Sequence, residues 1–130
     1  MDWHDIALGL AGLIGSIVAV VHGVLIQRHA VRPLRALYLA DKRISAPIQR
    51  LVPLLLHFST ISWFLGGLGL IAAANWFHQD ARLATGLWVG SSYLIGALGN
   101  LWATRGRHPG WVLYAAAVIL IVAGLSGSGS

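Results

Sequence analysis

The chain has 130 residues, of which 57% are hydrophobic and only 10% are charged, and its mean hydropathy is +0.74. These values fall outside the usual range of water-soluble domains and indicate an integral membrane protein. The chain has no cysteine, which excludes disulfides, thiolate nucleophiles and sulfur metal ligands together.

Four apolar segments approach the length of about 20 residues that an α-helix needs to cross a bilayer. They cover residues 6–27, 51–74, 83–103 and 110–125. The connections between them are too short for a separate soluble domain, and consecutive helices are usually neighbours. The sequence therefore predicts a single all-α domain over residues 1–125, a bundle of four transmembrane helices in which neighbours run antiparallel.

The two ends of the chain are interpreted separately. The first apolar segment follows an acidic start, Met-Asp-Trp-His-Asp, and has no small-residue cleavage site, so we expect it to be a helix of the bundle and not a removable signal peptide. Residues 126–130 read Ser-Gly-Ser-Gly-Ser, the composition of a flexible linker, and are interpreted as a flexible tail or an appended linker.

The net charge of +5 is distributed unevenly. Eight of the nine basic residues lie between the first two or the last two apolar segments, and only Arg82 lies on the other side. By the positive-inside rule, both basic connections are cytoplasmic and both termini lie on the opposite side of the membrane. The charges therefore predict a multi-pass membrane protein. Its basic face would meet anionic lipid headgroups, and nucleic acid is not an expected partner.

Small residues form stripes along the first and third segments. Their alternating spacing of three and four places each stripe on one helix face: Gly9, Gly12, Ser16, Ala19 and Gly23 in one, and Gly86, Gly90, Tyr93, Ala97 and Asn100 in the other. In lipid, helix association depends on such close packing. The stripes predict contacts within the bundle or, alternatively, a surface for a homo-oligomer or a partner membrane protein.

One layer near the cytoplasmic boundary is unusually polar. His22 precedes the first arginine of the long basic connection by six residues, and His57 follows the last one by seven. At about 1.5 Å per residue, both lie on the order of 10 Å below the cytoplasmic edge. Asn100 and Tyr114 fall at a similar depth on the other two helices.

This layer has two interpretations. His22, His57, Thr60, Asn100 and Tyr114 could bond to one another as a neutral network that fixes the bundle. Alternatively, neutral imidazoles on facing helices could bind a metal, above all the iron of a haem b, with Asn100 and Tyr114 beside the cofactor. Two histidines alone form an incomplete zinc site.

The last basic connection offers a second candidate. Arg105, Arg107 and His108 could hold a phosphate or a phospholipid headgroup. The same residues are also explained as a topology-setting turn that Pro109 and Gly110 enforce.

Other catalytic signals are missing from the sequence. There is no glutamate, and all four aspartates lie at or beyond the expected membrane boundaries, so the usual carboxylate of a proton-coupled transporter is absent. A transporter would have to depend on His22 or His57. No serine elbow or phosphate-binding glycine loop is present either, which argues against an enzyme.

Two resemblances bear on the chain. The stretch LHFSTISWFLGGL, with His57, Trp63 and Gly66-Gly67, resembles a helix of copper-resistance D-type membrane proteins and of haem-binding protoporphyrinogen oxidases, although the histidine-to-tryptophan spacing here is six instead of seven. That resemblance implies a metal or haem role for His57. Through QRHAVRPL, LVPLLLHFSTISWFLGG and NLWATRGRHPGW, the chain resembles a group of small, uncharacterised four-helix inner-membrane proteins of proteobacteria. It implies fold and location but no activity.

The leading hypothesis is a non-catalytic membrane protein that acts through helix packing or partner association. The alternative is a haem b or metal protein that uses His57 and His22 for electron transfer or cofactor handling.

Overall fold

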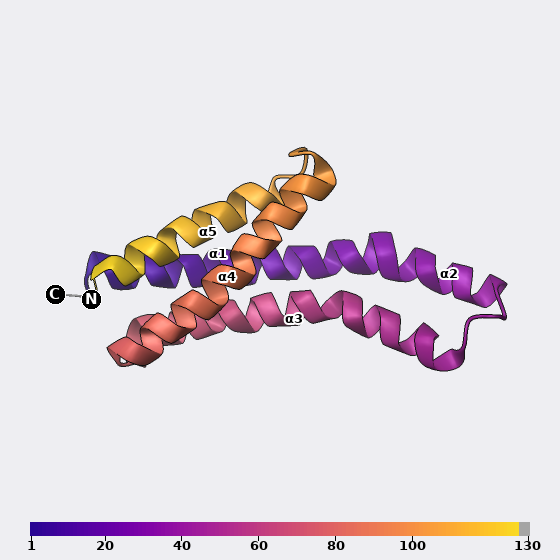
Figure 1. Cartoon of the computed structure of the whole chain (residues 1–130), viewed down its shortest axis with the longest axis horizontal. Helices are drawn as coiled ribbons and strands as arrows, with labels where there is room; N and C mark the ends of the chain where they lie inside the picture. Colours follow the sequence, from indigo (N-terminus) through magenta and orange to yellow (C-terminus); the bar gives the residue numbers. More distant parts are fainter. Residues whose placement is uncertain (128–130) are drawn as a thin grey trace.

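A computed structural model describes residues 1–127, and all regular structure in that range is helical (Figure 1). The elements in chain order are α1 (Trp3–Ile26), a π-helical turn η1 (Gln27–Val31), α2 (Arg32–Ala40), α3 (Ala46–Trp76), α4 (Gln79–Thr104) and α5 (Gly110–Ser126). The all-α prediction is confirmed. Of the expected tail, Ser126 belongs to α5 and Gly127 caps it, while residues 128–130 lie outside the described range.

Two of the helices in the described range are long and apolar enough to cross a membrane. One is the continuous helix Trp3–Ala40, with 38 residues, and the other is α3, with 31. The other two long helices, α4 and α5, meet the criteria of length and hydrophobicity less well. α5 has only 17 residues, and α4 begins with a polar turn that contains Gln79, Asp80 and Arg82.

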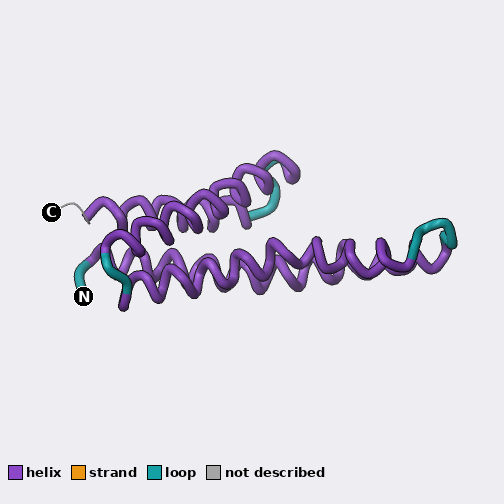
Figure 2. Tube along the Cα trace, turned by 60° about the horizontal axis from the view of Figure 1, so that its bottom comes forward, coloured by secondary structure: helices purple, strands orange, loops and turns teal. Residues whose placement is uncertain are grey.

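The long basic connection is a helical hairpin. α1 continues through η1 into α2, and α3 begins at Ala46, before the expected start at residue 51. Proline is acceptable in the first turn of a helix, because the missing N–H has no intrahelical partner there. Pro47 occupies such a position in α3. Pro33 lies instead inside the continuous helix Trp3–Ala40, just after the π-helical turn. The hairpin extends past the turn between α4 and α5 (Figures 1 and 2).

Both termini lie at one end of the bundle, and the basic turns point to the other end (Figure 1). The first helix starts with a capping box, in which the Asp2 side chain accepts from the Asp5 N–H at 3.0 Å and the Asp5 side chain accepts from the Asp2 N–H at 3.2 Å. The hydrogen bond from the Asp5 backbone lowers the pKa of Asp2. The Arg43 guanidinium, which donates to Asp41 in the α2–α3 turn, likewise lowers the pKa of Asp41.

Close backbone contact joins α1 to α3. A Cβ at Gly67 would meet the carbonyl of Gly12 at 2.5 Å, and a Cβ at Gly23 would meet the Thr60 methyl at 2.7 Å. Ala19 is fully buried. Ser16 is also buried and donates to the Phe64 carbonyl at 3.5 Å, so four of the five members of the first stripe pack within the bundle. Gly9 is the exception, because no atom of the described chain lies within 4 Å of its Cβ position.

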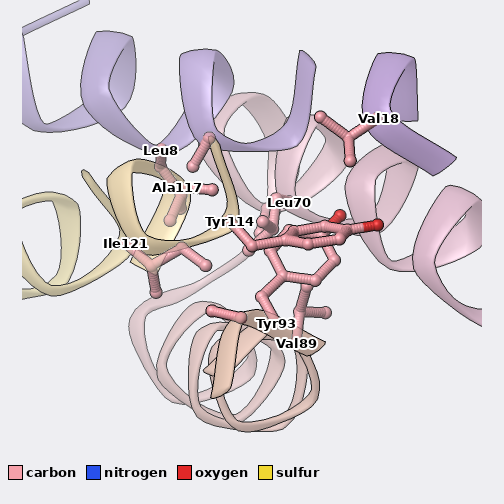
Figure 3. Packing of buried hydrophobic residues seen from close by; sticks show 11 residues of the cluster. Leu8, Val18, Leu70, Val89, Tyr93, Tyr114, Ala117 and Ile121 are labelled. Carbon is pink, nitrogen blue, oxygen red and sulfur yellow. The ribbon is translucent and has the colours of Figure 1, made fainter. Parts of the chain in front are cut away.

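The core lies where α1, α3, α4 and α5 meet. Its largest members are Tyr93, Tyr114, Leu8 and Leu70, each no more than 2% exposed (Figure 3). In the second stripe, Gly86 faces the Leu125 side chain and Gly90 faces Ile121. This stripe holds α4 against α5.

Candidate ligand cavity

A cavity of about 170 Å³ lies between α1, α4 and α5, towards the basic end of the bundle. Its wall is mostly aliphatic, and four polar side chains interrupt it: His22, Asn100, His108 and Tyr114. An apolar cavity with a few convergent polar groups is the usual form of a small-molecule site. Three of the five predicted members of the polar layer, His22, Asn100 and Tyr114, thus line one cavity together with His108.

Tyr114 supplies the deepest polar atom of the cavity. The residue is 2% exposed, and within residues 1–127 its hydroxyl has no hydrogen-bond partner. The neighbouring Tyr93, whose ring centroid is 5.0 Å away, instead donates to the Trp63 carbonyl at 2.9 Å. Both hydroxyls point away from Leu8, towards the Val18 end of α1 (Figure 3). The Tyr93 hydroxyl therefore has a hydrogen-bond acceptor, whereas the Tyr114 hydroxyl has none among the described residues.

His22 is held in place from the α3 side. Its Nε2 lies 3.2 Å from Ser59 Oγ, and the Ser59 hydroxyl donates to the Leu56 carbonyl at 3.5 Å. The serine therefore accepts from His22 Nε2, which leaves Nδ1 of the neutral ring as an acceptor. The ring also meets Trp63 edge-on at 4.8 Å, and Trp63 lies 4.8 Å from Tyr114. His22 and Tyr114 therefore line the cavity, and Trp63 contacts both of them without lining it.

The α4–α5 turn closes the basic end of the cavity. Arg105 and Gly106 adopt positive φ angles of 51° and 75°, which reverse the chain after α4. His108 Nδ1 accepts from the Gly110 N–H at 3.1 Å, so its Nε2 carries the proton of the neutral ring. Asn100 Oδ1 is buried and has no partner among the described residues.

His57 lies outside this cavity. Its Nε2 donates to Gln27 Oε1 at 2.9 Å, at the start of the π-helical turn. Thr60 Oγ1, expected in the same network, is buried and has no partner in the described part of the chain. The structure therefore does not contain the mutual network that the sequence predicts. Instead, His22 bonds to Ser59 and His57 bonds to Gln27. Among the described residues, the side-chain oxygens of Thr60, Asn100 and Tyr114 have no partner.

The histidine pair does not fit a shared haem as it stands. Both Nε2 atoms, the usual axial donors, are engaged with Ser59 and Gln27. Axial ligation would break both hydrogen bonds and draw His57 away from the π-helical turn. Over residues 1–127, no group of three or more histidine or carboxylate side chains is placed to hold a metal ion.

The three residues suggested for an anion are divided between two environments. Arg105 and Arg107 are exposed. His108 is half-buried, with its ring against Gly110 and the cavity. His108 therefore belongs with the ligand cavity, a role that the turn composition did not reveal.

Sequence reasoning missed a polar site at the opposite end. Arg82 forms an ion pair with Asp5 and donates to the Gly124 carbonyl at 3.3 Å. The two charged side chains are only 14% and 23% exposed. The available signal was that the sequence places a lone basic residue and an aspartate at the same end of the bundle.

No protein-family model, curated protein or solved structure matches this chain. Function is therefore inferred from the geometry of the chain itself.

Proposed function

We propose that the chain is a four-helix integral protein of the bacterial inner membrane, and that it acts without catalysis by associating with a partner helix. Two membrane-length helices and the collection of basic residues at one end support the location, with both termini periplasmic. The resemblance to small proteobacterial inner-membrane proteins agrees with it. Anionic headgroups would meet the basic turns.

The observation that carries the proposal is an unpartnered face of α4. Large residues that are 72–85% exposed alternate with small ones at spacings of four and three, in the order Trp88, Ser92, Ile95, Gly99 and Trp102. Among the described residues, nothing lies within 4 Å of the Gly99 Cβ position. This is the spacing of a coiled-coil seam, in which large side chains of one helix fill the spaces above small residues of the next.

The same face borders a groove of about 500 Å³ between α3 and α4. Ser62, Ser91 and Ser92 place hydroxyl groups along it, between the rings of Phe58 and Trp88. Hydroxyl and small residues are common where helices associate in lipid. The groove therefore has the chemistry of a helix-binding surface.

A second copy of this chain is the occupant that fits best. Two copies inserted in the same orientation bring identical α4 faces together around a two-fold axis, as in most homo-oligomers. The Ile95 side chain of each copy would then lie against Ser92 and Gly99 of the other. The alternation of large and small residues makes the face complementary to itself.

Cysteine cross-linking tests this association cleanly, because the chain has no native cysteine. We expect Ser92→Cys to form a disulfide-linked dimer in native membranes. The matched control is Ile119→Cys on α5, which is 68% exposed and should stay monomeric. Equal cross-linking at both positions would mean random collision and would contradict the proposal.

Gly99→Leu, added to the Ser92→Cys protein, gives an independent test. A leucine has room in the monomer, because no described atom lies close to that position. It would nevertheless keep two α4 helices apart, so we expect disulfide cross-linking to fall about tenfold, equivalent to about 1.4 kcal/mol. Unchanged cross-linking would place the interface elsewhere.

The haem alternative has a direct spectroscopic test. Protein purified in mild detergent from cells supplied with haem would be recorded in the oxidised and in the dithionite-reduced state. We expect no Soret band, because both histidines have side-chain partners. A Soret band that His57→Ala removes would establish a b-type haem protein and overturn the non-catalytic proposal.

A further inference from the structure

The size of the cavity between α1, α4 and α5 limits what can occupy it. Its volume is about 170 Å³, and an apolar protein cavity of about 150 Å³ is known to bind benzene. One six-membered ring therefore fits, whereas a fused ring system or a macrocycle does not. The Tyr114 ring lines the cavity and offers a flat surface against which an aromatic ligand can pack, and Trp63 lies 4.8 Å from Tyr114 between ring centroids.

The polar atoms of the cavity specify what the ring should carry. The Tyr114 hydroxyl and Asn100 Oδ1 are both buried, and in residues 1–127 neither has a partner. Buried polar atoms are rarely left in this condition, because the lost hydrogen bonds with water are not replaced. A carbonyl oxygen on the ring would accept from Tyr114, and a ring hydroxyl would donate to Asn100. The imidazole rings of His108 and His22 add two further polar groups to the wall of the cavity.

The aliphatic wall faces lipid. Ile17, Val21 and Leu113 line the cavity and are 56%, 52% and 44% exposed. A ligand can enter between them from the bilayer and leave an apolar chain in the hydrocarbon. Entry from water is less favourable, because the turn residues His108, Pro109 and Gly110 cover the basic end.

We propose that this cavity binds the head ring of a membrane-soluble, single-ring quinone or its quinol. The ring lies in the cavity and its chain passes out between Ile17 and Val21. In both redox forms one ring oxygen accepts from the Tyr114 hydroxyl, and in the quinol a ring hydroxyl also donates to Asn100 Oδ1. This site is separate from the α4 face described above. Loss of quinone binding would leave dimerisation intact, and loss of dimerisation would leave quinone binding intact.

The test uses Trp63 as an internal reporter, because it lies against both Tyr114 and His22. The other five tryptophans are replaced by phenylalanine, and the protein is placed in lipid nanodiscs. Methyl-1,4-benzoquinone is the probe, with its quinol as the reduced form and toluene as a ring of similar size without oxygens. The absence of cysteine removes the usual thiol target of such quinones. Quinones quench indole fluorescence, so binding is followed as a saturable decrease in Trp63 emission.

We expect saturable quenching that Tyr114→Phe weakens about tenfold, the upper range for one net hydrogen bond. The matched control is Tyr93→Phe, which removes a hydroxyl already bonded to the Trp63 carbonyl and should leave the affinity within about twofold. Toluene should compete only weakly. Val21→Phe, at a half-exposed position on the cavity wall, should block binding without introducing a buried polar defect.

Several results would overturn the proposal. Quenching that rises linearly with the quinone content of the lipid would show partition only. Equal affinity in the Tyr114→Phe protein, or equal competition by toluene, would show an apolar cavity without oxygen recognition. Should Tyr114→Phe fail to fold, unchanged quenching in the Val21→Phe protein would place the bound quinone outside this cavity.

Discussion

At the level of single residues, a partly buried ion pair between Asp5 and Arg82 lies at the end of the bundle that holds both termini. Arg82 is the one basic residue that the charge distribution leaves on that side, and the structure explains its position. It joins the start of α1 to α4 and, through the Gly124 carbonyl, to α5. The sequence places Asp2, Asp5 and Asp80 at the same end of the bundle as Arg82, but only the fold shows that Arg82 pairs with Asp5.

Asp5→Asn is expected to lower the free energy of unfolding by about 2 kcal/mol, since it removes a charged hydrogen-bond acceptor from a largely buried guanidinium. Chemical unfolding in detergent, followed by circular dichroism, measures the change. Asp80→Asn is the matched control: Asp80 is exposed and, over the described range, forms no ion pair. A loss as large in Asp80→Asn would assign the effect to net charge and not to the pair.

At the level of helices, the small-residue stripe of α1 makes a prediction with an internal control. A Cβ at Gly12 would meet the Ile71 side chain at 2.9 Å and its backbone N at 3.1 Å, whereas no described atom lies near the Cβ position of Gly9. Gly12→Ala should therefore destabilise the protein by about 1–3 kcal/mol through overpacking. Gly9→Ala should stabilise it by about 0.5–1 kcal/mol, because alanine restricts the unfolded chain.

Thermal unfolding of the two variants beside the parent protein decides this prediction. The opposite signs are informative, because both changes add one methyl group to the same helix three residues apart. Destabilisation by both would mean that the Gly9 side of α1 is also covered. That outcome would direct the search for a partner surface from α4 to α1.

Sequence periodicity predicted the helices and the α1 packing stripe, because both depend on local spacing. It did not predict the directions of His22 and His57. A change of one residue turns a helical side chain by about 100°, and the π-helical turn at Gln27–Val31 adds a rotation that no composition rule revealed. The cavity was also unpredictable, because it depends on how three helices diverge. His108 illustrates this: its neighbours in sequence are exposed arginines, but its ring faces Asn100 and Gly110.

At the level of the whole molecule, the helical hairpin of α2 and the start of α3 is the main departure from a simple bundle. It extends past the α4–α5 turn (Figure 1) and contains five basic residues, Arg32, Arg35, Lys42, Arg43 and Arg50. α2 contains no buried residue. We expect the hairpin to project into the cytoplasm, with its arginines within reach of anionic headgroups.

Labelling of single cysteines tests this orientation. Lys42→Cys, at the exposed tip of the hairpin, should be protected from a membrane-impermeant maleimide in cells with a permeabilised outer membrane and labelled after lysis. Asp80→Cys, in the first turn of α4, should be labelled before lysis. The reverse pattern would invert the topology, and labelling of both sites before lysis would contradict a membrane crossing by α3.

If α5 crosses the membrane, as the proposed four-helix topology requires, its length of 17 residues has a consequence for the bilayer itself. At 1.5 Å per residue the helix is about 26 Å long, shorter than the hydrocarbon thickness of about 30 Å. In a bilayer, such hydrophobic mismatch is relieved when lipid chains beside the short helix compress or when shorter lipids gather there. The bilayer would then be thinner beside α5 than beside α1 and α3, and its lipid chains there would be more disordered. Because α5 contributes Leu113 and Tyr114 to the cavity wall, this deformed annulus lies at the entrance that a lipid-soluble ligand would use.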